Sequence, residues 1–250
     1  MLLVLTAIGL TLLGSLGGLL LASTLLLFND RVRLRLIPSL ISYAVGTLLG
    51  VALLALLPNA LETLAPIRVL GTLLAGILLF FVLEKLVIWR HCHTEECATH
   101  SSAAPLVLIG DAFHNFVDGA VIGAAVVSSI PLGVGTAVAV AAHEIPQEVG
   151  DFAILLGSGY TRQRALMLNV VSGLSAVAGT LVALFALEWV PGVLPYVLSV
   201  AAASFLYIAM ADLIPDLNRG RMDARAIRQI LLVCTGILTV IIVEWLLGLS

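Results

Sequence analysis

Long apolar runs separated by short polar breaks fill the chain from end to end. A helix needs about 20 mainly apolar residues to cross the hydrocarbon core of a bilayer, and eight runs reach that length. We therefore predict an all-α integral membrane protein with eight transmembrane helices in one domain, residues 1–250. The predicted helices are residues 2–28, 37–58, 67–89, 104–129, 132–157, 163–188, 192–215 and 226–248.

The lysines and arginines lie almost entirely on one side of this arrangement. Of the 12, only Arg68 falls on the side that holds the breaks after the second, fourth and sixth helices. Cytoplasmic loops are enriched in Lys and Arg, so the basic side is expected to be cytoplasmic and both termini extracytoplasmic. In a prokaryote this would be the plasma (inner) membrane. The first helix has no positive segment before it and is interpreted as a mature helix rather than a cleaved signal.

Composition agrees with the membrane prediction. The chain is 61% hydrophobic and 11% charged, whereas soluble domains carry about 25% charged residues. The lipid bilayer is therefore an expected partner, and no nucleic-acid partner is expected. The sequence leaves open whether the protein works as a homodimer.

A weak internal repeat relates the second and seventh predicted helices. Residues 44–58 align with residues 201–215 at an offset of 157, and five of the fifteen positions are identical. The two helices run in opposite directions, so the pattern indicates an inverted repeat, which in secondary transporters commonly places the substrate near the membrane midplane. A match of this size also arises by chance in Ala- and Leu-rich helices, so the alternative of no repeat stays open.

Nine polar side chains interrupt the fourth and fifth predicted helices. At about 100° per residue they form one polar stripe on each helix. Ionisable residues inside a membrane span are costly and mark functional sites by default, so the stripes should face each other along an ion path. The residues are Asp111, His114, Asn115 and Asp118 on the fourth helix, and His143, Glu144, Gln147, Glu148 and Asp151 on the fifth.

The antiparallel order of these helices predicts which residues share a depth. His114 is expected opposite Gln147 and Glu148 near the middle of the membrane, and Asp118 further out beside His143. Imidazole and carboxylate together suit zinc, and iron or manganese with less preference. We therefore predict a carrier with Zn²⁺ as its transported substrate, and Fe²⁺, Mn²⁺ or Cd²⁺ as alternatives.

Other classes of function fit the same residues less well. His143-Glu144-Ile-Pro146-Gln147 is similar to H-E-x-x-H, the zinc motif of metalloproteases, but has Gln147 where the second His is required. An intramembrane zinc metalloprotease therefore remains an alternative. A proton-coupled or anion carrier is a third, but it leaves the histidines without a clear reason.

The motifs at these residues resemble those of the ZIP (Zrt-, Irt-like protein) family of divalent metal transporters. The resemblance extends over the whole chain. The family's His-Asn-x-x-(Asp/Glu)-Gly and His-Glu-x-Pro motifs are matched by His114, Asn115, Asp118 and Gly119, and by His143, Glu144 and Pro146. The later Glu148, Gly150, Asp151 and Phe152 are similar to the branch with His-Glu-x-Pro-His-Glu-x-Gly-Asp-Phe. The resemblance implies a 3+2+3 helix arrangement, a metal site on helices four and five, and zinc uptake toward the cytoplasm without enzymatic chemistry. It leaves open whether the site is binuclear.

Three positions depart from the family pattern. Gln147 stands where that branch has His and many members have Glu, which should weaken one metal site. No His lies near Pro58, where the branch often has one. Ala176 lies near the position where some members hold a helix VI Glu, so a second metal site is expected to be incomplete.

Polar residues outside the two stripes could extend the metal path. Asn59 and Glu62 could collect cations at the entrance or only cap a helix end, and Asp212 could join the exit path or pair with an arginine. The predicted cytoplasmic loop, residues 90–103, could receive or sense metal, or could be a solvated linker. Its candidate ligands are His91, Cys92, His93, Cys97 and His100.

Overall fold

The computed structural model describes residues 2–25, 27–28, 30–91, 103–190, 192–217 and 224–246, and every regular element in these ranges is helical. The first half contains α1 (Leu2–Leu25), α2 (Asp30–Gly50), the π-helix η1 (Val51–Leu56), α3 (Leu57–Leu61), α4 (Pro66–His91) and α5 (Ala103–Ser128). The second half contains α6 (Ile130–Gly157), α7 (Arg162–Gly173), α8 (Ser175–Trp189), α9 (Leu194–Tyr207), the π-helix η2 (Ile208–Leu213), α10 (Ile214–Leu217) and α11 (Ala224–Leu246). The all-α prediction is confirmed for these residues.

Six stretches of the described chain are long and apolar enough to cross a membrane. They are Leu2–Leu25, Leu36–Leu61, Pro66–Leu83, Arg162–Trp189, Leu194–Ala211 and Ala226–Leu246, and they coincide with six of the predicted spans. The predicted spans 104–129 and 132–157 form α5 and α6, which are not among the six. Their polar stripes lower their mean hydropathy, so their passage through a membrane stays a prediction.

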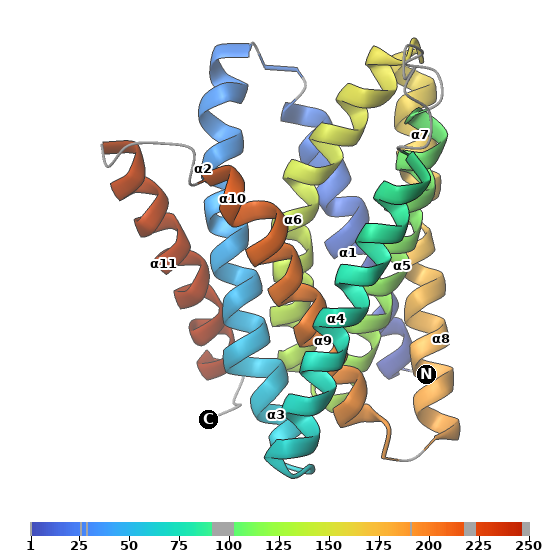
Figure 1. The fold of residues 1–250 in the computed structure, drawn as a ribbon, viewed down its shortest axis with the longest axis vertical. Coiled ribbons are helices and arrows are strands. Elements are labelled where there is room, and N and C mark those ends of the chain that lie inside the picture. Colours follow the sequence, from blue (N-terminus) through green and yellow to red (C-terminus); the bar gives the residue numbers. More distant parts are fainter. Residues whose placement is uncertain are drawn as a thin grey trace.

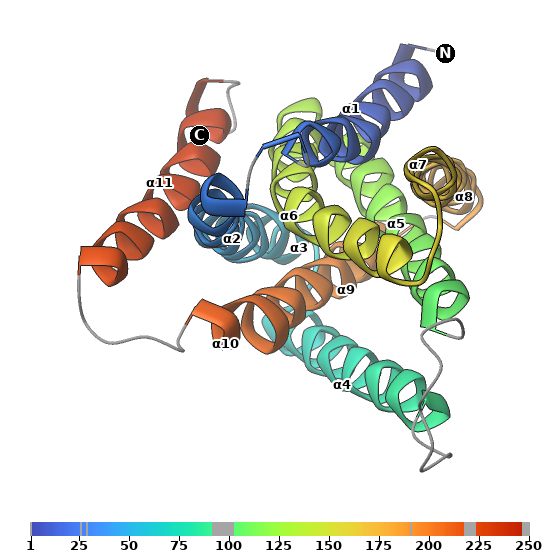
Figure 2. The ribbon, with the colours of Figure 1, turned by 90° about the horizontal axis from the view of Figure 1, so that it is seen from above.

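The helices pack as a bundle with α5 and α6 in its middle (Figures 1 and 2). α6 packs against α1 and α2, α5 packs against α8 and α9, and α5 and α6 pack against each other. The start of α1 and the end of α11 lie at the same end of the bundle (Figure 1). The two helices with polar stripes are therefore surrounded by apolar ones, which shield the polar side chains from the outer surface.

Glycines hold α5 against α8. A Cβ at Gly119 would overlap the Ala176 carbonyl, and a Cβ at Gly179 would overlap the Phe116 carbonyl. Small residues of this kind let the backbones of membrane helices approach closely. Gly119 follows directly after Asp118, so one side of α5 fixes the helix on α8 while the polar stripe stays turned toward α6.

The two π-helices occupy equivalent places in the suggested repeat. η1 and η2 lie at the same offset of 157 residues that aligns the two sequence segments. In each, the residue before a proline donates its backbone N–H to the carbonyl five residues earlier: Leu57 to Ala52, before Pro58, and Ile214 to Ala209, before Pro215. A proline ring clashes with the carbonyl four residues before it, and a wider π turn relieves that clash.

Close helix contacts repeat at the same offset. A Cβ at Gly46 of α2 would overlap the Val233 carbonyl of α11, and a Cβ at Gly76 of α4 would meet the Ala203 side chain of α9. Adding 157 to Gly46 gives Ala203, and adding 157 to Gly76 gives Val233. The α2–α11 and α4–α9 pairs therefore pack through equivalent residues.

Candidate metal site

Four metal-ligating side chains meet between α5 and α6; we call His114, Asp118, His143 and Glu144 the histidine cluster. One ligand atom from each lies within 4.8 Å of the others. His143 Nε2 is 3.1 Å from His114 Nε2 and 2.9 Å from Asp118 Oδ2. His114 Nε2 is 3.5 Å from Asp118 Oδ2 and 3.7 Å from Glu144 Oε1. The four side chains therefore surround one small space.

The atoms that face this space are acceptors. His143 Nδ1 lies 3.0 Å from the Ala139 carbonyl oxygen and donates to it, so Nε2 is the nitrogen that can bind an ion. Nε2 lies 2.9 Å from Asp118 Oδ2, close enough for the two atoms to share a proton that an ion would replace. Within the described residues the carboxylate of Glu144 has no hydrogen-bond partner. Buried polar atoms are normally paired. A cation in the space would satisfy all of these acceptors at once.

Burial makes the attraction for a cation strong. Asp118 and Glu144 are fully buried and His143 is 1% exposed, whereas the His114 side chain is 22% exposed. The ring of Phe205 on α9 stands 6.1 Å from the ring of His143 and covers that side. Charges interact more strongly away from water. The partly exposed side chain of His114 forms an open edge of the cluster.

Local structure explains how the chain builds the cluster. Asp118 lies one turn after His114, so both side chains project from the same face of α5. α6 begins at a Ser129 N-cap, whose side chain accepts from the Leu132 N–H, and continues unbroken through Pro146 to Gly157. His143 therefore faces both α5 ligands from a regular helix.

The depth alignment predicted from the sequence was right for Asp118, which lies beside His143 as expected, and wrong by about one turn for His114. His114 was expected opposite Gln147, but its ring contacts His143, and Gln147 Nε2 instead donates to Asp111 Oδ1 over 3.3 Å. Equal-depth pairing from the sequence assumes straight helices parallel to the membrane normal, whereas packed helices tilt. The amide of Gln147 is therefore hydrogen-bonded to Asp111 and does not belong to the histidine cluster.

Asn115 lies in a hydrogen-bonded network rather than in the cluster. Its Oδ1 accepts a 2.7 Å bond from Ser15 Oγ of α1, and its Nδ2 donates a 3.0 Å bond to Asp111 Oδ1. Ser15 also donates to the Gly173 carbonyl over 3.2 Å. This network ties α1, α5 and α7 together beside the cluster.

Glu148 and Asp151 lie further along α6, beside Asp111 of α5. The charges of all three carboxylates act on one another, and Asn169 of α7 lies next to Glu148. Glu148 is 1% exposed and Asn169 is fully buried. Asn169 was not predicted as a site residue, although an amide in the apolar run Leu-Met-Leu-Asn169-Val-Val could have drawn attention to it.

Of the remaining candidates, the structure describes the side chains of Asn59 and Glu62. Asn59 donates to the Ala55 carbonyl over 3.1 Å and accepts from Ser128 Oγ over 2.9 Å, which ties α3 to the end of α5. Glu62 is exposed just after α3. Asp212 belongs to η2 and His91 ends α4, but their side chains lie outside the described part of the structure, as do Cys92, His93, Cys97 and His100.

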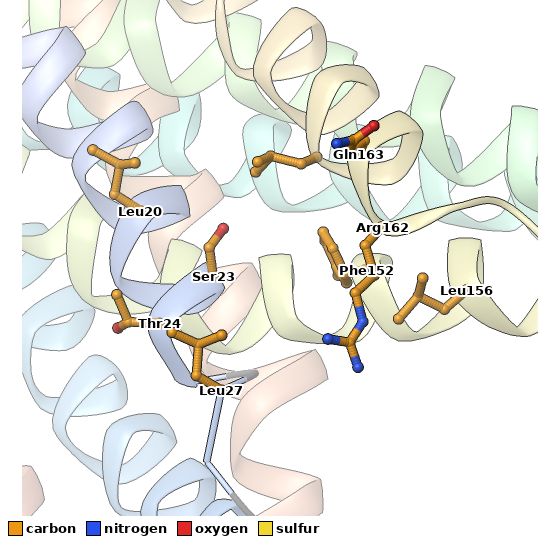
Figure 3. A pocket seen from close by; sticks show the side chains of 9 residues that line it. Leu20, Ser23, Thr24, Leu27, Phe152, Leu156, Arg162 and Gln163 are labelled. Carbon is orange, nitrogen blue, oxygen red and sulfur yellow. The ribbon is translucent and has the colours of Figure 1, made fainter.

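A separate cavity of about 430 Å³ lies between α1, α6 and α7. Figure 3 shows its lining side chains, with Leu20 of α1 and Leu27 just after α1 facing Phe152 and Leu156 of α6, and the guanidinium of Arg162 nearby. An apolar cavity with a cationic side chain is unsuited to a metal cation. The histidine cluster is therefore the better candidate for a metal site.

Comparison with known proteins agrees with these side chains. Residues 89–244, which include both polar stripes, match the family described as ZIP Zinc transporter. The chain belongs to this family. Zinc transporter ZIP13 of Pongo abelii is 34% identical over 218 residues, which cover 81% of this chain and 65% of the relative.

Two further ZIP relatives match the chain more locally. Zinc transporter ZIP4 of Rattus norvegicus is 46% identical over 116 residues, or 46% of this chain and 18% of the relative. Zinc transporter ZIP10 of Danio rerio is 40% identical over 120 residues, or 48% of this chain and 14% of the relative. The matches span from about a seventh to about two thirds of the length of these three relatives.

Proposed function

We propose that this ZIP-family chain carries a divalent metal ion, with zinc as its main substrate, across a membrane by way of the histidine cluster. The observation that carries the proposal is a buried space lined by two imidazoles and two carboxylates, whose ligand atoms lie within 4.8 Å of one another. Imidazole nitrogen and carboxylate oxygen are zinc's usual ligands in the absence of cysteine. The relatives named as zinc transporters support zinc as the substrate.

The proposed path needs α5 and α6 to cross the membrane with the six apolar spans, which gives eight helices in a 3+2+3 order. The matched π-helices and the repeated glycine contacts support an inverted repeat of the first three and last three helices. The exposed leucines and isoleucines of α4 and α11 suit a lipid surface. The repeat would place α5 and α6 between two similar bundles, where a substrate site is common.

Uptake toward the cytoplasm is the direction that membership of the ZIP family implies, and the placement of basic residues supplies the orientation of the chain. The side with eleven of the 12 lysines and arginines is proposed to be cytoplasmic, with both termini on the opposite side. On this orientation Glu62 lies at the outer end of the bundle, and Asp111 and Asp151 lie inward of the histidine cluster. The inward group would then receive the ion on its way to the cytoplasm.

The intramembrane metalloprotease has less support. A protease of the H-E-x-x-H type needs the residue four after His143 to bind zinc, and the Gln147 amide donates to Asp111 instead. A carrier that prefers iron or manganese keeps the same ligands and differs only in selectivity.

A flux assay tests the proposed function. The full chain is reconstituted in lipid vesicles that enclose a metal-sensitive dye, and Zn²⁺, Fe²⁺, Mn²⁺ or Cd²⁺ is added outside, with and without a proton gradient. We expect saturable entry of Zn²⁺, faster than that of Mn²⁺. Vesicles that admit none of these ions above the protein-free background would contradict the proposal.

A further inference from the structure

The cavity between α1, α6 and α7 contains none of the residues proposed to hold the metal ion. Its volume of about 430 Å³ lies in the range of about 300–1,000 Å³ that small-molecule sites occupy. It is lined by the end of α1, the end of α6 and the start of α7. These three helix ends meet on the side of the bundle that holds most of the basic residues, which is the proposed cytoplasmic side.

The cavity has apolar walls and opens on the outer surface of the bundle. Five of its nine lining residues are leucine or phenylalanine. Leu20 and Leu27, on the α1 side, are 66% and 81% exposed, whereas Phe152 of α6 is buried and forms part of the inner wall. The outer surface of a membrane-spanning bundle faces the hydrocarbon chains of the lipid. An apolar hollow in that surface is therefore open to a lipid acyl chain.

A guanidinium stands at the cytoplasmic end of the cavity. Figure 3 shows the head of Arg162 toward the end marked by Leu27, away from Leu20. The chain runs from Leu20 to Leu27 toward the proposed cytoplasmic face, since α1 starts at the opposite end of the bundle. The cation therefore lies at the depth of the lipid head groups, and the apolar walls extend below it.

The charge of Arg162 is not matched by the protein. The ion pairs found in the described ranges involve His114 and His143, and none involves Arg162. The neighbouring Arg164 is placed differently, because its guanidinium lies 5.0 Å from the centre of the Tyr160 ring. A guanidinium binds a phosphate through two parallel N–H bonds. Arg162 is thus complementary to an anionic head group whose chain enters the cavity.

We propose that this cavity binds one anionic phospholipid of the cytoplasmic leaflet. The phosphate lies on Arg162, and one acyl chain lies between Leu20 of α1 and Phe152 of α6. Basic pockets between membrane helices on the cytoplasmic side bind anionic head groups, and anionic lipids give that leaflet its negative surface potential. The lipid would join three helices, so it should stabilise the folded bundle. The proposal concerns lipid binding alone and holds whether or not the chain transports zinc.

Native mass spectrometry of the full chain in detergent tests the proposal. The protein is titrated with phosphatidylglycerol or with phosphatidylcholine of the same acyl chains, and occupancy by the first lipid is counted. We expect about fivefold tighter binding of phosphatidylglycerol, which is about what one Arg near an anionic surface contributes. Phosphatidylglycerol should also raise the melting temperature more than phosphatidylcholine does, because a ligand that binds only the folded state stabilises it.

Two arginine variants carry the same change of charge. Arg162→Gln should abolish the preference for phosphatidylglycerol, because the phosphate loses its partner. Arg164→Gln, the matched control, should keep the preference of the parent, because that guanidinium stacks on Tyr160. Arg162→Lys keeps the charge without the two parallel donors and should retain part of the preference.

A cavity-filling variant tests the acyl chain. Leu20→Trp places a larger apolar side chain in the hollow at a position that is mostly exposed. It should weaken the first phosphatidylglycerol and the first phosphatidylcholine alike. Thermal unfolding of each lipid-free variant identifies any loss of binding that follows from misfolding.

The outcomes separate this site from other occupants and from transport. Equal binding of the two lipids by the parent, or equal losses in Arg162→Gln and Arg164→Gln, would overturn the proposal. Displacement of phosphatidylglycerol by inorganic phosphate at the same concentration would also overturn it, because the site would then hold a free anion. Unchanged binding in Leu20→Trp would place the lipid elsewhere. Selective lipid binding by a chain without zinc flux would overturn the transport function alone.

Discussion

The histidine cluster and a second group of buried polar side chains, Asp111, Glu148 and Asn169, which we call the oxygen group, present different atoms. Both groups lie on α5 and α6, and α7 adds Asn169 to the second. The cluster presents two imidazole nitrogens beside two carboxylates. The oxygen group presents two carboxylates and an amide. Nitrogen ligands favour zinc, and oxygen ligands hold it less firmly. The difference teaches that affinity for zinc should fall along the inward path, which favours release because a transported ion must leave as well as enter.

Removing an imidazole should have the largest effect. His143→Ala deletes the side chain that touches both His114 and Asp118. We expect zinc flux to fall by more than about a hundredfold, since losing even an indirect metal contact costs about 10–100-fold. Vesicle flux measures the loss. Ser199→Ala, which removes a buried hydroxyl of α9 bonded to the Pro195 carbonyl, is the matched control and should transport at the parent rate.

A larger residue at Gly119 should displace α5 from the side that packs on α8, away from the histidine cluster. Gly119→Ala would place a Cβ against the Ala176 carbonyl, and overpacking of this kind costs about 1–3 kcal/mol. We expect a lower melting temperature and reduced flux, because α5 must move relative to α6. Gly110→Ala, on the same helix with open space around its Cβ, should melt no lower than the parent. Equal melting of all three proteins would show that the α5–α8 contact is not close.

Replacing Gln147 by His should increase the zinc affinity of the site next to the histidine cluster. The amide now donates to Asp111 Oδ1, and an imidazole at this place would add a basic nitrogen between the cluster and the oxygen group. We expect Gln147→His to tighten zinc binding by about tenfold and to slow release, in line with the ligand preference of zinc. Calorimetry on the purified variant decides this. Unchanged affinity would mean that residue 147 faces away from the ion.

The smallest effect is expected in the predicted cytoplasmic loop. Replacing His91, Cys92, His93, Cys97 and His100 with Ser should leave zinc flux within a few-fold of the parent and change only its response to zinc inside the vesicle. Flux at several internal zinc concentrations measures this response. Complete loss of flux would instead place the loop on the obligatory path.

The sequence predicted the helical fold and the residues of the histidine cluster better than the alignment of α5 with α6. Polar stripes on apolar helices identified His114, Asp118, His143 and Glu144, because a charge inside a membrane helix is costly and is rarely kept without a functional role. The pairing of Asp118 with His143 was predicted correctly, but the partner of His114 was not, because helix tilt is set by packing that a sequence does not display. Asn169 was not predicted because it is an isolated amide on a helix that has no polar stripe.

For the proposed inverted repeat, the structure gives stronger support than the sequence does. Five identities in fifteen positions are weak evidence for a repeat, because Ala- and Leu-rich helices match at this level by chance. The π-helices before Pro58 and Pro215, and the matched contacts of Gly46 and Gly76, depend on backbone geometry and give the same offset independently. Backbone features therefore support the proposed repeat more strongly than residue identities do.

X-ray absorption at the zinc edge tests the central claim most directly. With one equivalent of Zn²⁺ on the full chain, we predict two imidazole nitrogens at about 2.0–2.1 Å, oxygens at about 2.0–2.2 Å and no sulfur at about 2.3 Å. In His143→Ala the spectrum should show one imidazole. A first shell that contains sulfur, or that is made of oxygen alone, would contradict the account, because the tightest site would then lie outside the histidine cluster.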